Sequence, residues 1–186
     1  MENTITIFQN IKETEAPFYR ELNVILKRIK EGTSKDLIAE IRGEDDKNKR
    51  NELKKKLPAI CFSGKFNKRK DSSIIEHSGI ICLDFDGYPK QKDLLQDKER
   101  FVKNKYVHSI FVSPSGNGLK VLVRIPPDAE NHSKYFNALE KEFNSNYFDR
   151  TTKNISRVCY ESYDPLIYIN ENSFVWETLA EEEYKE

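Results

Sequence analysis

The sequence has no long apolar run, which excludes a membrane-spanning protein, and no net charge, which weakens but does not exclude binding to a polyanion. No segment approaches the roughly 20 apolar residues of a membrane-spanning helix, and the N-terminus MENTITIFQN does not show the basic, apolar and small-residue order of a signal peptide. We therefore expect a cytoplasmic protein that makes no membrane contact. Lysine plus arginine and aspartate plus glutamate number 31 each, so a polyanionic partner would have to be bound by a local basic surface.

Cysteine is also scarce, because the chain has three such residues, Cys61, Cys82 and Cys159, each flanked by apolar or aromatic neighbours. This pattern favours buried free thiols over a disulfide or a metal site. Charged and aromatic residues, by contrast, make up 33% and 11% of the 186 residues. Such a composition is typical of a folded protein in water, with one main hydrophobic core at this length.

The second part of the chain shows an alternating order of strands and helices. Periodicity predicts strands at 79–85, 108–113, 119–125 and 156–162, and helices at 91–104 and 132–145. This β-α-β-β-α-β order predicts an α+β fold with a ferredoxin-like or RNA-recognition-like core, in which both helices cover one face of an antiparallel sheet. Residues 166–170 could extend that sheet.

We expect this core to span residues 74–186 and an N-terminal α/β extension, residues 1–73, to pack on it. The extension is predicted to contain a strand, two helical stretches and a second strand, at 4–8, 18–30, 35–56 and 57–66. The acidic end of the chain, residues 176–186, is expected to form a surface helix or a linker.

The predicted topology brings three distant segments to one edge of the sheet. The first two strands run parallel and end at the same edge, the turn into the third strand lies there, and the second helix returns the chain to it. We therefore expect segments 84–86, 113–120 and 149–157 to meet.

The first of these segments contains Asp84 and Asp86 at the end of an apolar strand. Residues two apart face the same side of a strand, so the two carboxylates lie close enough to share an ion. A divalent cation removes the repulsion between such carboxylates and accepts their oxygens as ligands. A simple turn at DFDGYP explains the same residues equally well, because Asp and Gly are common in turns.

The second segment is a turn rich in serine and glycine, followed at once by a lysine. Its backbone amides, hydroxyls and lysine would suit a triphosphate, and the candidate nucleotide-binding residues are Ser113, Ser115, Gly116, Asn117, Gly118 and Lys120. An ordinary glycine hairpin is the alternative. The segment is not a Walker loop, since the order of residues differs and a strand follows it.

The third segment offers Asp149 and, further on, Arg157. A third carboxylate would complete a site for two metal ions that bridge nucleotide phosphates, and the arginine would face phosphate or base. Both residues also have plain interpretations, as a surface turn and as the partner of a nearby acid. Asp164 is the competing carboxylate, although the YDPL sequence around it is more typical of a turn.

Two basic stretches are candidates for nucleic-acid contact. In GKFNKRKD, the basic residues Lys65, Lys68, Arg69 and Lys70 have Phe66 among them, a mix that suits phosphate contact and plain solubility equally. The charged run at 45–56 is expected to be a solvated helix face rather than a contact surface.

Together, the aspartate pair after an apolar strand, the Ser-x-Ser-Gly-x-Gly turn and the later Asp followed by Arg resemble the archaeo-eukaryotic primase superfamily of primase-polymerases. The chain is more closely similar to the VirE-type N-terminal domains that bacterial mobile elements carry ahead of a helicase. The strings ELKKKLPAICFSGKF and HSGIICLDFDG carry this closer resemblance, which covers nearly the whole chain.

The resemblance implies a nucleotidyltransferase that acts in replication of a mobile element, with a nucleoside triphosphate, a single-stranded DNA template and a fused or separate helicase as partners. It implies that Asp84, Asp86 and Asp149 are catalytic ligands of Mg²⁺ or Mn²⁺ and that the serine and glycine turn binds the incoming nucleotide. Many superfamily members carry a histidine where Lys120 stands. Lysine supplies charge to a phosphate without imidazole geometry, so this departure puts polymerisation in question more than nucleotide binding.

Two alternatives remain at this point. ICLDFDG also fits the first motif of haloacid-dehalogenase-type phosphatases, with Ser113 in their second, but that pair normally lies near the start of the fold and no acidic pair follows it here. The other alternative is a non-catalytic nucleic-acid-binding replication module. The predicted strands offer few aromatic residues for base stacking, which favours the polymerase-like use of the sheet edge.

Overall fold

The computed structural model describes residues 3–180 and is built around a central sheet with the strand order β10-β7-β8-β6. These strands are β6 (Ile80–Phe85), β7 (Val107–Val112), β8 (Leu119–Arg124) and β10 (Tyr168–Ile169). β8 pairs antiparallel with β6 on one side and with β7 on the other. Most positions in β6, β7 and β8 are buried, because both faces of this sheet are covered.

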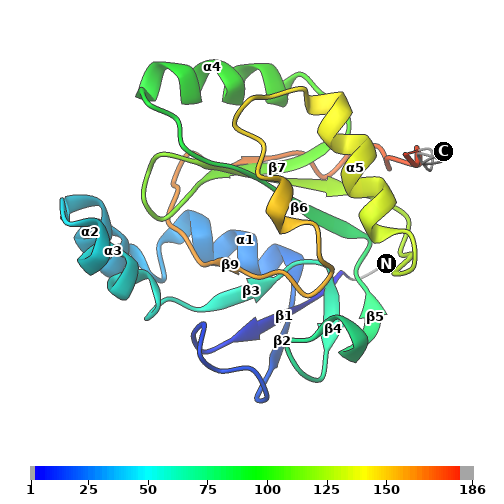
Figure 1. Ribbon diagram of the computed structural model, residues 1–186, viewed down its shortest axis with the longest axis horizontal. Helices are drawn as coiled ribbons and strands as arrows, with labels where there is room; N and C mark the ends of the chain where they lie inside the picture. Colours follow the sequence, from blue (N-terminus) through cyan, green and yellow to red (C-terminus); the bar gives the residue numbers. More distant parts are fainter. Residues whose placement is uncertain (1–2, 181–186) are drawn as a thin grey trace, which may run out of the picture.

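Helices α4 (Gln91–Val102) and α5 (His132–Phe143) cover one face of the central sheet, and Figure 1 shows both on the same side of it. Leu83 and Phe85 of β6 point toward these helices and pack in one core with apolar residues of both. Because alternate residues of a strand face opposite sides, Asp84 points to the other face. That face carries the candidate site.

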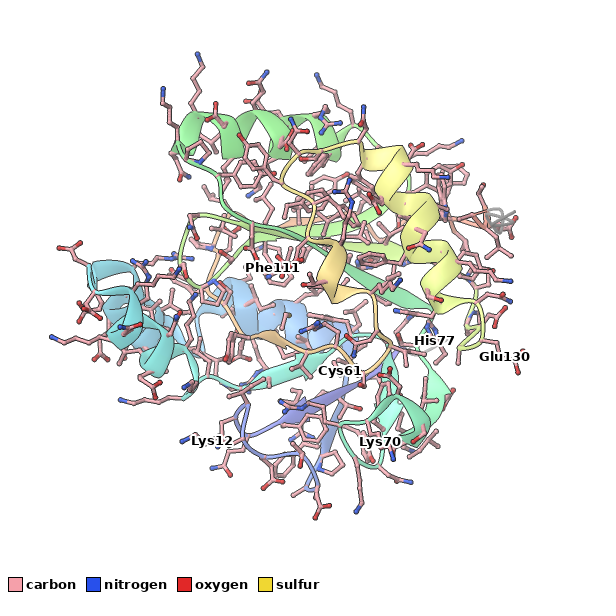
Figure 2. All side chains as sticks on the ribbon, in the orientation of Figure 1. Lys12, Cys61, Lys70, His77, Phe111 and Glu130 are labelled. Atoms are coloured by element: carbon pink, nitrogen blue, oxygen red, sulfur yellow. The ribbon has the colours of Figure 1, made fainter. Side chains whose placement is uncertain are left out.

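The other face packs against a helix and a second sheet. Helix α1 (Leu22–Glu31) lies between the central sheet and strand β1 (Thr4–Phe8), and Phe111 of β7 points into this layer (Figure 1, Figure 2). The second sheet has the order β2-β1-β3-β9, and its other strands are β2 (Phe18–Glu21), β3 (Ala59–Cys61) and β9 (Cys159–Tyr160). It therefore joins strands from the predicted extension to a strand from the predicted core.

The predicted order from β6 to α5 is confirmed, and the protein has a mixed α+β fold. The prediction of a fourth strand beside β6 in a ferredoxin-like sheet is wrong, because β9 pairs with β3 rather than with β6. The chain after α5 makes a single antiparallel bridge to β6, between Phe148 and Phe85. The 3-10 helix η2 (Arg150–Thr152) then turns it away from the sheet. Residues 166–170 do extend the central sheet, as β10 beside β7.

The N-terminal part differs from its prediction in several places. The expected helix at 18–30 starts with β2, whose residues pair with β1. The expected helix at 35–56 is divided into α2 (Lys35–Gly43) and α3 (Lys47–Lys54); the Asp46 side chain caps the second by accepting from the Lys49 amide at 2.8 Å. The expected strand at 57–66 is divided into β3 and β4 (Gly64–Phe66). β4 pairs with β5 (Ile74–His77), which had no separate prediction.

Three smaller predictions concern single features. The cysteines are free, with Cys61 buried and the other two half-buried. Within residues 3–180, no helix has the length and apolar character needed to cross a bilayer. The predicted helix or linker at 176–186 lies partly outside the described residues, and its first residue, Trp176, packs into the core beside α5.

Candidate metal and nucleotide site

The structure brings together the three carboxylates predicted from distant segments. One oxygen from each of Asp84, Asp86 and Asp149 lies within 4.8 Å of the others. Backbone pairing holds them there, since the Asp149 amide donates to the Asp84 carbonyl at 2.8 Å and the Asp86 amide donates to the Tyr147 carbonyl at 2.9 Å. These two bonds flank the bridge at Phe85, so the acidic group, which we call the acidic triad, is fixed by main-chain geometry against its own repulsion.

Asp84 is a half-buried member of the triad that pairs with a cation. Its side chain is 15% exposed, and it forms an ion pair with Lys120, its register partner on β8. Burial raises the pKa of Asp84 to about 6, and the nearby charges of Asp86 and Asp149 act in the same direction against the opposing effect of Lys120. Burial alone would lower the pKa of Lys120, but Asp84 and Asp86 outweigh it and raise that pKa above its ordinary value. The ion pair with Lys120 therefore offsets part of the effect of burial on Asp84.

Two buried oxygen atoms at the site have no hydrogen-bond partner among the described residues, Asp84 Oδ1 and Ser113 Oγ. Buried polar atoms are normally paired, and each unpaired one costs on the order of 1–3 kcal/mol. An orphaned carboxylate oxygen beside two further carboxylates suits a divalent cation, because Mg²⁺ and Mn²⁺ prefer oxygen ligands. The residues present therefore fit the metal that the sequence predicted.

The second segment forms a tight turn between β7 and β8, which we call the glycine turn (residues 113–118). The Ser113 amide donates to the Gly118 carbonyl and the Gly116 amide donates to the Ser113 carbonyl, both at 2.9 Å. Gly116 has a φ of 79°, in the left-handed region that favours glycine. A Cβ atom at Gly118 would overlap Asp86 Oδ1 and would lie 2.8 Å from the Phe85 carbonyl oxygen. Glycine at this position thus lets the turn touch the acidic triad.

The glycine turn is also held by Arg42 of α2, which the sequence analysis missed. The Arg42 guanidinium donates to the carbonyls of Ser113 at 3.2 Å, Pro114 at 3.3 Å and Tyr163 at 2.9 Å. No local pattern marks this residue, because the contact joins segments about seventy positions apart in the sequence. The turn is consequently braced from outside rather than by its own residues alone.

The triad and the turn line a cleft of about 530 Å³, a volume within the range of small-molecule sites. The predicted nucleotide-binding residues that line it are Ser113, Ser115, Asn117, Lys120 and Arg157. Gly116 and Gly118 do not line the cleft but allow the glycine turn its conformation and its close approach to Asp86. Arg157 extends from the third segment and donates to the Thr151 carbonyl at 2.6 Å. Cys159 also lines the cleft, although the sequence analysis assigned it no chemistry.

Helix α3 contributes cations to this cleft. These residues were predicted to lie on a solvated helix face. None of its residues is buried, as predicted, but Lys47, Arg50 and Lys54 line the same cleft as the triad. Their i, i+3, i+7 spacing puts them on one side of a helix. That spacing was the signal available in the sequence.

The other predicted basic residues lie elsewhere, on β4 and the loop after it. Lys65 Nζ lies 5.1 Å from the ring centre of Tyr19, and Lys68 pairs with Glu15 at 2.8 Å. The Arg69 side chain donates to a carbonyl of the β1–β2 loop at 2.7 Å. None of the three lines the 530 Å³ cleft, and their contact with nucleic acid stays a prediction.

The competing carboxylate, Asp164, has a structural role instead. It accepts hydrogen bonds from the amides of Val112 and Leu166, both at 2.9 Å, and Lys98 lies 3.4 Å away. It thereby anchors the chain after β9 to the end of β7.

These features define a class: a mixed α+β protein with a candidate metal and phosphate-ligand site at the edge of its central sheet. Residues 52–169 match the family model described as BT4734-like, N-terminal domain, and the chain belongs to that family. Comparisons with curated proteins and with solved structures found no match.

Proposed function

We propose that this protein is a primase-polymerase-type nucleotidyltransferase domain that acts in replication of a mobile element. It would bind a nucleoside triphosphate with Mg²⁺ or Mn²⁺ and extend a strand on a single-stranded DNA template, beside a fused or separate helicase. The observation that carries the proposal is the acidic triad, whose oxygens lie within 4.8 Å of one another at the wall of a cleft shared with the glycine turn. The resemblance to primase-polymerases supports the same assignment.

Each residue has a role that follows from its position. Asp84, Asp86 and Asp149 would hold the metal, which when bound neutralises phosphate charge and lowers the pKa of an attacking hydroxyl. The glycine turn would present its serine hydroxyls to phosphate, and Gly118 allows it to do so next to Asp86. Lys120 pairs with Asp84 and opposes the rise of its pKa, and Arg157 would contact phosphate or template.

A binding module without turnover is the second candidate, and one observation favours it. The Lys120 ammonium, which stands where a histidine is expected, is paired with Asp84, one of the proposed metal ligands. Such a module would keep nucleotide or nucleic-acid binding and lack incorporation. A haloacid-dehalogenase-like phosphatase would instead require Asp84 as a nucleophile.

Template-directed incorporation of labelled nucleotides with Mn²⁺ tests the proposal. We expect incorporation by the wild type and none by the Asp84→Asn, Asp86→Asn double variant. Glu99→Gln, which removes an exposed carboxylate of α4, is the matched control and should keep wild-type activity. The assay is run in parallel with metal-dependent triphosphate binding.

Absence of incorporation by the wild type would refute the enzyme assignment, and retained binding by the double variant without metal would favour the binding module. Hydrolysis of small phosphate esters with a trapped aspartyl-phosphate on Asp84 would establish the phosphatase instead.

A further inference from the structure

Helix α3 presents one face to the cleft, while Leu53 on another side of it packs against the small core formed by Ile38, Ile41 and Leu57. Lys47, Arg50, Asn51 and Lys54 all line the cleft, at the i, i+3, i+4 and i+7 positions of one helix face. Figure 1 shows the α2–α3 pair at the end of the molecule where the loop between β7 and β8 also lies. The glycine turn, α3 and the acidic triad thus all line one cleft.

The cations on this face of α3 are not neutralised by protein carboxylates. Among the described residues, Lys47, Arg50 and Lys54 form no ion pair, and the Arg50 side chain donates to the Glu44 carbonyl at 3.1 Å. Lys55, at the C-cap of the helix, does pair with an acid, Glu52. Three of the four cations within α3 therefore line the cleft without a carboxylate partner in the described part of the chain, and the fourth, Lys49, is exposed away from it.

Lys54 is half-buried. Burial lowers its pKa, and the negative charge of Asp86 opposes this effect. The Lys54 ammonium group is therefore partly desolvated and lies within the electrostatic field of the acidic triad. A cation in such surroundings gains from an added anion more than a fully solvated lysine does, because the interaction is less screened.

The charge of the whole cleft also favours an anion. Of the described residues that line it, five are cationic and three are carboxylates, which leaves two positive charges in excess. With a divalent cation on the triad the excess increases further. A ligand that brings both phosphate charge and metal-binding oxygens complements this arrangement.

We propose that α3 binds the terminal phosphates of the nucleoside triphosphate, across the cleft from the glycine turn. The inference rests on the proposed function for the identity of the ligand and adds a second phosphate-binding wall from the N-terminal part of the chain. The volume of about 530 Å³ suits a ligand of nucleotide size. A single ligand could therefore contact both walls.

Calorimetric titration with nucleoside tri-, di- and monophosphates in Mg²⁺ tests the assignment. We expect Lys54→Gln to weaken triphosphate binding about tenfold, the value of one lost charged hydrogen bond, and to leave monophosphate binding within about twofold. Lys49→Gln is the matched control, because it removes the same charge from an exposed position of α3 that does not line the cleft. Its triphosphate affinity should equal that of the wild type.

Equal affinities in Lys54→Gln and Lys49→Gln, or an equal loss for mono- and triphosphate, would overturn the inference. A loss of single-stranded oligonucleotide binding with triphosphate binding unchanged would also overturn it, and would assign α3 to the nucleic-acid strand. No triphosphate binding by the wild type would refute both the inference and the nucleotide part of the proposed function. A triphosphate-specific loss in a protein that incorporates no nucleotide would support the inference and refute polymerisation alone.

Discussion

The buried pair His77 and His132 predicts a strong acid sensitivity of folding. His77, on β5, lies at the end of α5 where His132 begins that helix (Figure 2), and His77 Nε2 is 3.0 Å from His132 Nδ1. The Gly79 amide donates to His77 Nδ1 at 2.9 Å, so His77 carries its proton on Nε2 and donates it to His132. Burial lowers the pKa of His77 from 6.5 to about 4 and that of His132 from 6.5 to about 3, although Asp128 and Asp71 respectively act against it.

The magnitude follows from linkage. A histidine whose folded pKa lies below its unfolded value contributes stability above pH 6.5 that is lost as the pH falls toward the folded pKa. Between about pH 8 and about pH 5 the histidine becomes protonated in the unfolded chain but stays neutral in the folded protein. The free energy of unfolding therefore falls by about 2 kcal/mol for each such histidine. This value hardly depends on the folded pKa once that pKa lies below about 5.

The perturbation is His132→Asn, whose amide oxygen can accept from His77 Nε2 as Nδ1 does but cannot be protonated. Urea unfolding, followed by the fluorescence of the buried Trp176, gives the free energy of unfolding at each pH. We expect the variant to lose about 2 kcal/mol less than the wild type between the two pH values. Only this difference is used, because the substitution also changes stability at neutral pH.

The other shifted groups are common to both proteins and cancel. His108 adds its own acid sensitivity, since burial lowers its pKa to about 4. Asp84 acts with the opposite sign, because its pKa is raised to about 6 and the stability it contributes is lost as the pH rises through that value. An identical loss of stability in the wild type and in His132→Asn would refute the reasoning that the pair is held neutral by burial.

Three further predictions concern two residues that shape the site and one buried ion pair of the fold. Gly118→Ala should lower the free energy of unfolding by about 1–3 kcal/mol and weaken Mn²⁺ binding in calorimetry, because the new Cβ would lie 2.8 Å from the Phe85 carbonyl oxygen; unchanged metal affinity would contradict this. Arg42→Met removes the brace of the glycine turn and should weaken triphosphate binding roughly fivefold, or about 1 kcal/mol, with metal binding intact. Glu161→Gln should cost about 3 kcal/mol in urea unfolding, since Glu161 is fully buried and bonds Arg28 at 2.6 and 3.1 Å; a loss below 1 kcal/mol would argue against this pair.

The elements from β6 to α5 could be predicted because their patterns are local. In β6 the residues that face the helices alternate with those that face the second layer, and in α5 the buried positions follow helical spacing. From that order alone the parallel arrangement of β6 and β7 follows, and with it the edge of the sheet where Asp84 and the glycine turn meet. This part of the site needed no knowledge of distant contacts.

The elements that were mispredicted depend on partners far away in the sequence. Residues 18–21 could continue the following helix, yet they pair with β1 and form β2. β9 has two residues and exists through its pairing with β3. In the same way, Arg42 and Glu161 act through contacts with residues 71 and 133 positions away, and neither is marked by any local pattern.

The position of Asp149 was predicted correctly from a topology that is partly wrong. The prediction assumed a full fourth strand beside β6, whereas the structure has one bridge, Phe148 to Phe85, and two flanking backbone hydrogen bonds. The Asp149 carboxylate then accepts from the Thr151 amide at 2.9 Å, which starts η2 and turns the chain away. A single backbone bridge therefore suffices to bring the third carboxylate to the other two. The rest of the segment pairs with β3 and contributes further residues to the lining of the cleft.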